Sequence, residues 1–133
     1  SHAIELAVNQ INLKRAIAGH NLVVRVCDDT GDNGIAATEA QELLGEGAIA
    51  LVTTGSSQTI AIANVAVPAG AALMSISATS TQIPSAGVLP DGGAKRVWST
   101  AVSDSEQAQA LADQAHCAVL QPAFPFRQGV APA

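Results

Sequence analysis

Two short runs of serine and threonine carry the side chains in this sequence that are best suited to hold a small polar ligand. In the first run, Ser56 and Ser57 place hydroxyl groups beside the backbone amides that begin an expected helix, where unpaired N–H groups attract negative charge. In the second run, the carbonyl of Ser77 and the hydroxyl of Thr79 are acceptors for an ammonium or hydroxyl group. Together the two runs suit a zwitterion. The alternative is that they are ordinary helix caps and turns, where serine and threonine are favoured for local reasons.

The elements expected around the two runs would bring them to one edge of a sheet. Residues 48–54 form a short, almost unbroken apolar run, which predicts a strand covered on both faces. After the first serine run, the apolar residues take helical spacing as far as Pro68. Residues 72–75 read as the next strand, which leads into the second run. Ligands of open α/β sheets bind outside the carboxyl ends of the strands, so we expect both runs to face one crevice.

Helices and strands also alternate along the rest of the chain. Apolar spacing predicts a helix over residues 1–16, and the β-branched residues within 22–26 predict a strand. Asp32 or Asn33 can cap the next helix, and residues 95–99 read as a short strand. The buried stripe of that helix comprises Ala36, Ala40, Leu43 and Leu44. This alternation predicts an α/β fold, a doubly wound parallel sheet with helices on both faces in a three-layer αβα arrangement.

The C-terminal part of the sequence contains one well-defined helix start. Ser103 and Glu106 have the spacing of a capping box, in which the serine accepts a hydrogen bond from an amide and the glutamate reaches back. We expect the following helix to direct its apolar residues inward, namely Ala108, Leu111, Ala112 and Ala115. Residues 117–120 read as another strand. A long loop with a turn at 91–93 is expected before the capping box, and residues 121–133 have no usable pattern.

Several further residues could do chemistry, but each has a simpler interpretation that we favour. The adjacent carboxylates of Asp28 and Asp29 suit a metal or an acid–base pair, yet the polar, glycine-containing segment after them favours a solvated turn. Trp98 could stack on a ligand, but a single tryptophan in a strand is more often core. Cys27 and Cys117 are expected to be buried thiols, and pairing between them depends on geometry that sequence does not supply. Because the histidines are also isolated, we expect neither a metal site nor a cofactor.

Composition excludes several classes of protein. A chain of 133 residues is one domain by length, and 48% hydrophobic residues with 13% charged ones are typical of a folded chain. The net charge is −5 and the basic residues are scattered, so no nucleic-acid partner is expected. No apolar run is long enough for a transmembrane span, and the N-terminus lacks the pattern of a signal peptide, which a mature or truncated product could have lost.

Five segments of the sequence carry a family resemblance. They are AIELAVNQIN (3–12), LVVRVCDD (22–29), GSSQT (55–59), LMSISATS (73–80) and SDSEQAQALA (103–112). In this order they resemble the N-terminal lobe of type I periplasmic binding proteins, and most of all the leucine/isoleucine/valine-binding proteins of branched-chain amino acid ABC transporters. The resemblance implies that residues 1–116 are the N-terminal lobe and that residues 117–133 are a truncated start of the second lobe or an irregular tail.

This resemblance implies an extracytoplasmic solute-binding component of an ABC transporter, in the periplasm or outside the cell, with a transporter permease as partner and no enzymatic activity. In the family, the serine turn binds the α-carboxylate of the ligand, which corresponds to Ser56 with Ser57 beside it. The later turn binds carboxylate and ammonium through backbone groups and a threonine hydroxyl, and it corresponds to Ser77, Ala78 and Thr79. The implied ligand is a branched-chain or other small amino acid.

The sequence also departs from the family pattern. The family's first strand, which should precede Ala3 and is central in the sheet, is absent; its loss would expose the edges of two neighbouring strands and allow a dimer through an edge. Ile76 stands where proline is usual, Ser99 replaces a frequent arginine, and Gly55 replaces the cysteine of some relatives. The second lobe, which closes over the ligand, is missing, so weak binding is expected.

Three alternatives remain open. An effector-sensing domain of a regulator or receptor has the same fold, and a DNA-binding module or a membrane span in the full gene would identify it. An enzyme with a nucleophile or phosphate loop at residues 55–57 is the second, although the Gly-x-Ser-x-Gly spacing fails at Thr59 and no Gly-Lys-Ser/Thr follows. The third is a truncated product without present activity.

Overall fold

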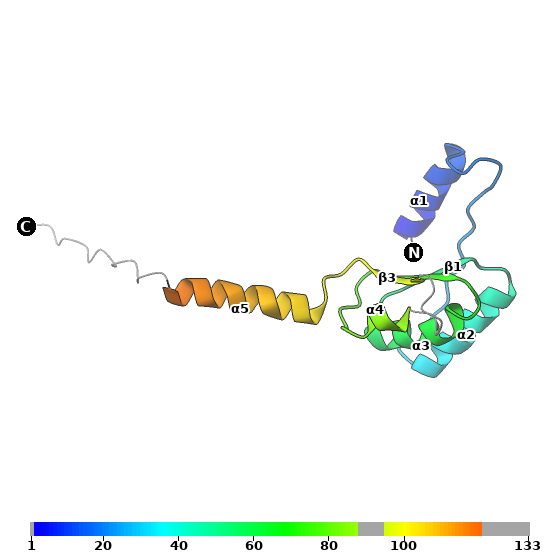
Figure 1. The fold of residues 1–133 in the computed structure, drawn as a ribbon. Coiled ribbons are helices and arrows are strands. Elements are labelled where there is room, and N and C mark those ends of the chain that lie inside the picture. The colour runs from blue at the N-terminus through cyan, green and yellow to red at the C-terminus, as the bar shows by residue number, and fades with distance from the viewer. Residues whose placement is uncertain (1, 88–94, 121–133) are drawn as a thin grey trace, which may run out of the picture.

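The computed structural model describes residues 2–87 and 95–120 of the chain. Its centre is a sheet of three parallel strands in the order β1-β2-β3 (Figure 1). The strands are β1 (Ala50–Thr53), β2 (Ala72–Ser75) and β3 (Val97–Ser99). The helices are α1 (His2–Leu13), α2 (Asn33–Gly45), α3 (Ser56–Ala66), α4 (Ile83–Ala86) and α5 (Asp104–Leu120). The α/β class with a parallel sheet, expected from the alternation of elements, is confirmed.

Helices lie on both sides of the sheet, although they cover it unequally. α2, α3 and α4 lie on one side and α1 on the other, while α5 extends away from the sheet (Figure 1). α2 starts where expected, because the Asp32 carboxylate accepts hydrogen bonds from the amides of Gly34 at 2.7 Å and Ile35 at 2.9 Å. α3 begins almost directly after β1, so the chain passes from the carboxyl end of a strand straight into the start of a helix.

The core lies between the sheet and the helices α2, α3 and α4. Leu51, Leu73 and Val97 form one row across the strands, and the last two are completely buried. The helices contribute residues that are mostly small, namely Ala36, Ala40, Ile62, Ala63, Ala66 and Ile83. Alanines let helix backbones approach a sheet closely, which is how a sequence with 2% aromatic residues builds a core.

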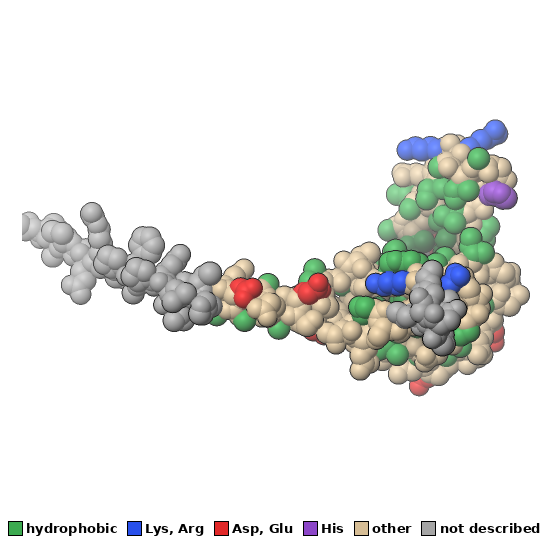
Figure 2. All heavy atoms as spheres, viewed as in Figure 1, with side chains coloured by type: hydrophobic (Ala, Val, Ile, Leu, Met, Phe, Trp, Pro, Cys, Tyr) green, Lys and Arg blue, Asp and Glu red, His purple; other side chains and the backbone are tan. Residues whose placement is uncertain are grey.

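The opposite face of the sheet is exposed in the structure. Val52, Met74 and Trp98 form the neighbouring row across the strands and are 67%, 41% and 39% exposed. The expectations that β1 is covered on both faces and that Trp98 lies in the core are therefore wrong. The reason is that α1, the helix on that side, has no buried residue. Hydrophobic side chains gather on α1 and toward the sheet beneath it (Figure 2).

The segment 22–26 does not form the expected strand. Residues 20–29 have no regular secondary structure, and Val23 and Val26 are largely exposed. A strand exists only when a neighbour pairs with its N–H and C=O groups, and the sheet of the described residues contains no partner for this segment. Asn12 holds it instead, because its side-chain amide donates to the Leu22 carbonyl at 2.9 Å and accepts from the Leu22 amide at 2.7 Å.

Other boundaries also differ from expectation. α1 ends at Leu13, α4 was not expected, and α5 continues through residues 117–120, where a strand was expected. The residues of α5 that were expected to be inward, Ala108, Leu111, Ala112 and Ala115, are exposed because the helix extends away from the sheet. The expected thiol of Cys27 is exposed and not buried. The turn at 91–93 and the tail 121–133 lie outside the described residues, as does the side chain of Cys117.

Substitutions on the two faces of the sheet test whether the buried row, which contains Leu73, stabilises the fold more than the exposed row, which contains Met74. Leu73→Ala should lower the free energy of unfolding by about 2–5 kcal/mol, because Leu73 is completely buried and the change leaves a cavity. The neighbouring Met74→Ala faces the other side and should cost less than about 1.5 kcal/mol. Urea unfolding followed by circular dichroism measures both. Equal losses for the two variants would contradict the one-sided core.

Candidate functional site

The carboxyl ends of β1 and β2 bring the two serine and threonine runs together. The strands pair in parallel with Thr53 opposite Ser75, so the turns that follow them leave the sheet at the same edge. The hydroxyl of Ser77 donates a hydrogen bond of 2.6 Å to the carbonyl of Thr54 and joins the two turns directly. The expectation that both runs lie at one edge of the sheet is confirmed, and Ser56 begins α3 just after this junction.

The start of α3 leaves its first backbone amides without partners in the helix. Gly55 is the N-cap residue in an extended conformation and supplies no side-chain cap. The first helical hydrogen bond runs from the Thr59 amide to the Gly55 carbonyl at 2.9 Å, so the amides of residues 56–58 have no partner within the helix. Ser56 is half-buried and Ser57 is exposed there. Uncapped amides and the positive end of the helix dipole favour a carboxylate at this position.

Gln58 is a residue of this region that the sequence did not single out. Its side-chain amide donates to the carbonyl of Gly31 at 2.8 Å and its oxygen accepts from the Ser57 hydroxyl at 3.1 Å. A Cβ on Gly55 would collide with the Gln58 amide group, so glycine at position 55 leaves room for this bridge. Gln58 thereby ties the start of α3 to the turn before α2. No local pattern indicates it, because Gly31 is distant in the sequence.

In the second turn, residues 77–79, several backbone groups are already hydrogen-bonded within the chain. Ala78 is 2% exposed, its amide donates to the Ser75 hydroxyl at 3.0 Å, and its carbonyl accepts from the Ser99 hydroxyl at 2.8 Å. The carbonyl of Thr79 accepts from the Asp104 amide at 2.8 Å. Ala78 therefore shapes the turn from inside, and both of its backbone groups already have partners within the chain.

Other polar groups of the same turn form no hydrogen bond within the described part of the chain. The Ser77 carbonyl, the Thr79 amide and the Thr79 hydroxyl make no hydrogen bond there. Ser77 is exposed and Thr79 is half-buried. The edge of the sheet thus presents two acceptors and one amide donor beside the uncapped start of α3, which is the combination that a zwitterion requires.

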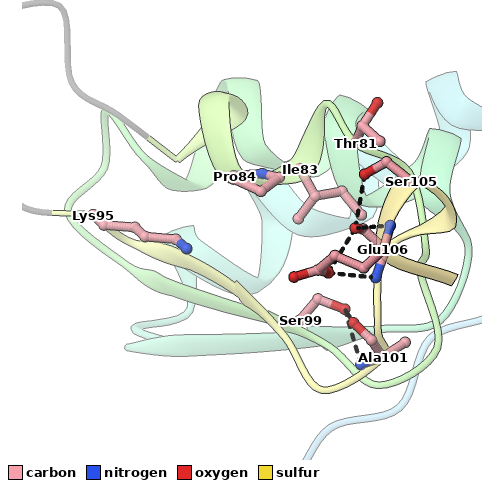
Figure 3. A pocket seen from close by; sticks show the side chains of 9 residues that line it. Thr81, Ile83, Pro84, Lys95, Ser99, Ala101, Ser105 and Glu106 are labelled. Carbon is pink, nitrogen blue, oxygen red and sulfur yellow. Dashed lines mark hydrogen bonds between the residues drawn. The ribbon is translucent and has the colours of Figure 1, made fainter. Parts of the chain in front are cut away.

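A hollow in the described surface lies near the end of β3. It has a volume of about 380 Å³ and lies between α4, the end of β3 and the start of α5. Lys95 and Glu106 contribute its charged groups and Ser99 a hydroxyl (Figure 3). None of Ser56, Ser57, Ser77, Ala78 or Thr79 lines it. This hollow is therefore not the crevice that was expected between the two runs.

Glu106 in this hollow forms the expected capping box. Its carboxylate accepts from the Ser103 hydroxyl at 2.6 Å and from the Ser103 amide at 3.1 Å, and its own amide donates to the Ser103 hydroxyl oxygen at 3.4 Å. The hydroxyl donor first, and the amide second, hold the pKa of Glu106 below its ordinary value. Glu106 is therefore anionic at neutral pH.

The acidic pair before α2 forms the turn that was favoured over a metal site. The carboxylate of Asp28 accepts from the Thr30 amide at 3.0 Å, and that of Asp29 accepts from the Gly31 amide at 2.9 Å. Gly31 has a φ of 78°, which glycine adopts without strain. Residues 2–87 and 95–120 contain no group of three or more possible metal ligands.

The neighbouring Glu39 carboxylate raises the pKa of the Cys27 thiol, so the thiolate is disfavoured. Among the described helices, none combines the length and apolarity that crossing a bilayer requires.

Comparisons with known proteins point to one family. Residues 1–118 match the family described as periplasmic binding protein. Two similar solved structures are ABC transporter substrate-binding proteins from Desulfitobacterium hafniense. The first, in complex with Leu, is 27% identical with a TM-score of 0.70, over 84% of this chain and 32% of that chain. The second is 28% identical with a TM-score of 0.66, over 83% of this chain and 33% of that chain.

The extent of these matches matters for what they imply. The chain spans about a third of the length of the two similar structures. No curated protein matches the sequence. The similarity therefore covers most of this chain but only about a third of each of those two proteins.

The capping box makes a test of the electrostatics at the start of α5. Ser103→Ala should raise the pKa of Glu106 toward the ordinary value of 4.5, because the hydroxyl donor is lost. In the unchanged protein the folded-state pKa is the lower one, so the box stabilises the fold above the unfolded-state value and loses its effect as the pH falls through the folded-state value. Titration of the Glu106 carboxyl carbon by NMR measures the shift.

Ser105→Ala is the matched control for that titration. The Ser105 hydroxyl lies 3.1 Å from the Ser103 hydroxyl and makes no hydrogen bond with the carboxylate. Its removal should leave the pKa of Glu106 depressed. A Ser103→Ala protein with an unchanged Glu106 titration would show that the box is not formed in solution.

Proposed function

The chain belongs to the periplasmic binding protein family, and we propose that it forms one half of a site that binds a small amino acid outside the cytoplasmic membrane. The observation that carries the proposal is the junction of the two turns through the Ser77–Thr54 hydrogen bond of 2.6 Å. The junction supports the proposal because it brings the start of α3, whose open amides would bind an anion, next to groups that would accept from an ammonium group. The type I resemblance of the sequence is confirmed by the family match and by the similar structures.

The contacts follow from the groups that lack partners. The amides at the start of α3 and the hydroxyl of Ser56 would bind the ligand's α-carboxylate. The Ser57 hydroxyl would join them by turning its hydrogen from the Gln58 side-chain oxygen to the carboxylate. The carbonyl of Ser77 and the hydroxyl of Thr79 would accept from its ammonium group. Ala78 would contribute by fixing the turn, because its own amide and carbonyl are bonded within the chain. The Leu complex of a similar protein supports an aliphatic amino acid as the ligand.

In the whole protein, binding would depend on a second lobe. The open edge at β1 and β2 provides one wall, and a facing lobe would close over the ligand by hinge motion and bury it. A closed form is favoured only by the contacts that the ligand makes there and not in the open form. The proposed role is delivery of the solute to an ABC transporter permease, without any chemical reaction, since the family binds solutes.

Weak but specific binding of leucine by the isolated chain tests the proposal. NMR titration should show millimolar affinity, because one wall supplies about half of the contacts. Ser56→Ala and Thr79→Ala should each weaken binding by about threefold to tenfold, the effect of one lost hydrogen bond. Thr81→Ala, an exposed residue two positions beyond Thr79, is the control and should bind as the unchanged chain does.

The same titration shows how the proposal would fail. A chain that unfolds cooperatively but shows no chemical-shift change with any aliphatic amino acid would have no working half-site. Binding that is insensitive to both Ser56→Ala and Thr79→Ala would place the ligand elsewhere.

We also propose that a second copy of the chain pairs with the free edge of β1. In the described sheet β1 has β2 on one side and no strand on the other. The carbonyls of Ile49 and Thr53 accept from Ala72 and Ile76 of the β2 segment, so by alternation the amide of Val52 faces the free edge. Two β1 edges related by a two-fold axis can pair as antiparallel strands.

Sedimentation velocity over a range of concentrations tests this pairing. The unchanged chain should form a dimer as concentration rises. Val52→Pro removes the outward amide while leaving the bonds to β2, and should be monomeric. Val52→Thr keeps the amide and should dimerise. A monomer at every concentration would overturn the proposal.

A further inference from the structure

The turn 77–79 is held from behind by hydroxyl groups of two strands. Ser75, at the end of β2, is completely buried and its oxygen accepts from the Ala78 amide at 3.0 Å. Ser99, at the end of β3, donates to the Ala78 carbonyl at 2.8 Å. Both peptide groups of Ala78 are thus fixed by side chains from neighbouring strands.

The direction of the Ser99 hydrogen bond is determined by its surroundings. The Ala101 amide, which can only donate, points its hydrogen at the Ser99 oxygen at 3.2 Å. The hydroxyl hydrogen is therefore free to go to a carbonyl, and the Ala78 carbonyl at 2.8 Å is nearer than that of Ala101 at 3.4 Å. Ser99 acts as a relay between the backbone after β3 and the turn after β2, and Figure 3 shows its contact with Ala101.

Because peptide groups are planar, the hydrogen bonds that fix Ala78 also fix the directions of the Ser77 carbonyl and the Thr79 amide. In a trans peptide, the C=O of one residue and the N–H of the next point in opposite directions. The Ala78 carbonyl points toward Ser99, so the Thr79 amide points away from Ser99. By the same rule, the Ala78 amide points toward Ser75 and the Ser77 carbonyl points away from it. The two groups that point away have no partner among the described residues.

We propose that Ser99 is a positioning residue, which aims the amide of Thr79 at the carboxylate of the ligand. This inference rests on the proposed function and assigns a role to a side chain outside the five expected contact residues. The short side chain of Ser99, at the end of β3, is long enough to donate to the Ala78 carbonyl at 2.8 Å. Ser75 aims the Ser77 carbonyl in the same way, toward the ammonium group.

The Thr79 amide would contact only the carboxylate of the ligand and the Ser77 carbonyl only its ammonium group, so ligands that lack one of these groups allow a selective test. Leucine carries both charged groups, 4-methylpentanoate carries only the carboxylate, and 3-methylbutylamine carries only the ammonium. Ser99→Ala should weaken binding of leucine and of 4-methylpentanoate by about threefold to tenfold, as expected for one misdirected hydrogen bond, and leave 3-methylbutylamine unaffected. NMR titration at millimolar ligand measures all three affinities.

Two further variants separate positioning from stability. Ser99→Thr keeps the hydroxyl and should restore binding of the carboxylate ligands. Ser85→Ala removes a serine-to-carbonyl bond of the same length, 2.8 Å, within α4, and should change neither affinity pattern. Equal weakening of all three ligands by Ser99→Ala, or failure of Ser99→Thr to restore binding, would overturn the inference and show a structural role only.

The test distinguishes this inference from the proposed function. If the unchanged chain binds leucine and Ser99→Ala binds the carboxylate ligands equally well, the inference is wrong and the proposed function stands. If the unchanged chain binds none of the ligands, the proposed function fails and the inference fails with it as a statement about a ligand. The Thr79 amide resonance then still reports whether Ser99→Ala reorients that peptide group.

Discussion

The parallel pairing of β1 with β2 is the constraint on which the candidate site depends. Because Thr53 lies opposite Ser75, the segments that follow β1 and β2 leave the sheet side by side. One short hydrogen bond between Ser77 and Thr54 joins these segments. A shift of this register by one residue would turn each strand's core row outward and separate the turns. The completely buried Leu73 in the row between the strands resists such a shift.

What the molecule leaves unpaired is as informative as what it pairs. At the sheet edge where β1 and β2 end, the hydroxyls of Ser75 and Ser99 form hydrogen bonds with the amide and carbonyl of Ala78. A small set of donors and acceptors of the same turn remains without partners among the described residues. Glycine at position 55 removes a side-chain cap and leaves the amides of α3 open. Ala78, at the centre of the turn, is buried and both of its backbone groups are hydrogen-bonded. A turn fixed in this way beside a helix start with open amides is preorganised, which would keep the cost of ordering low for the proposed ligand.

The sheet itself is unevenly covered, and this has a physical consequence. The row of Leu51, Leu73 and Val97 is packed by alanine-rich helices, whereas the row of Val52, Met74 and Trp98 faces α1 without being buried by it. Stability therefore comes mainly from one side of the sheet. The chain spans about a third of the length of the two similar structures.

Sequence alone determined the features that depend on near neighbours. The Asp32 cap, the capping box of Ser103 and Glu106, and the strand 72–75 follow from local hydrogen bonds and apolar spacing, and each was found where expected. The edge that holds Ser56 and Thr79 also followed, because parallel strands must end together.

Only the tertiary structure decided the features that need a partner distant in the sequence. The segment 22–26 has the residues of a strand but no partner in the described sheet, and Trp98 is exposed because none of the described helices buries its row. Ser99 and Gln58 became visible only when folding brought the Ala78 and Gly31 carbonyls to them. Local patterns record what a residue prefers, whereas pairing and burial depend on which surfaces the rest of the chain supplies.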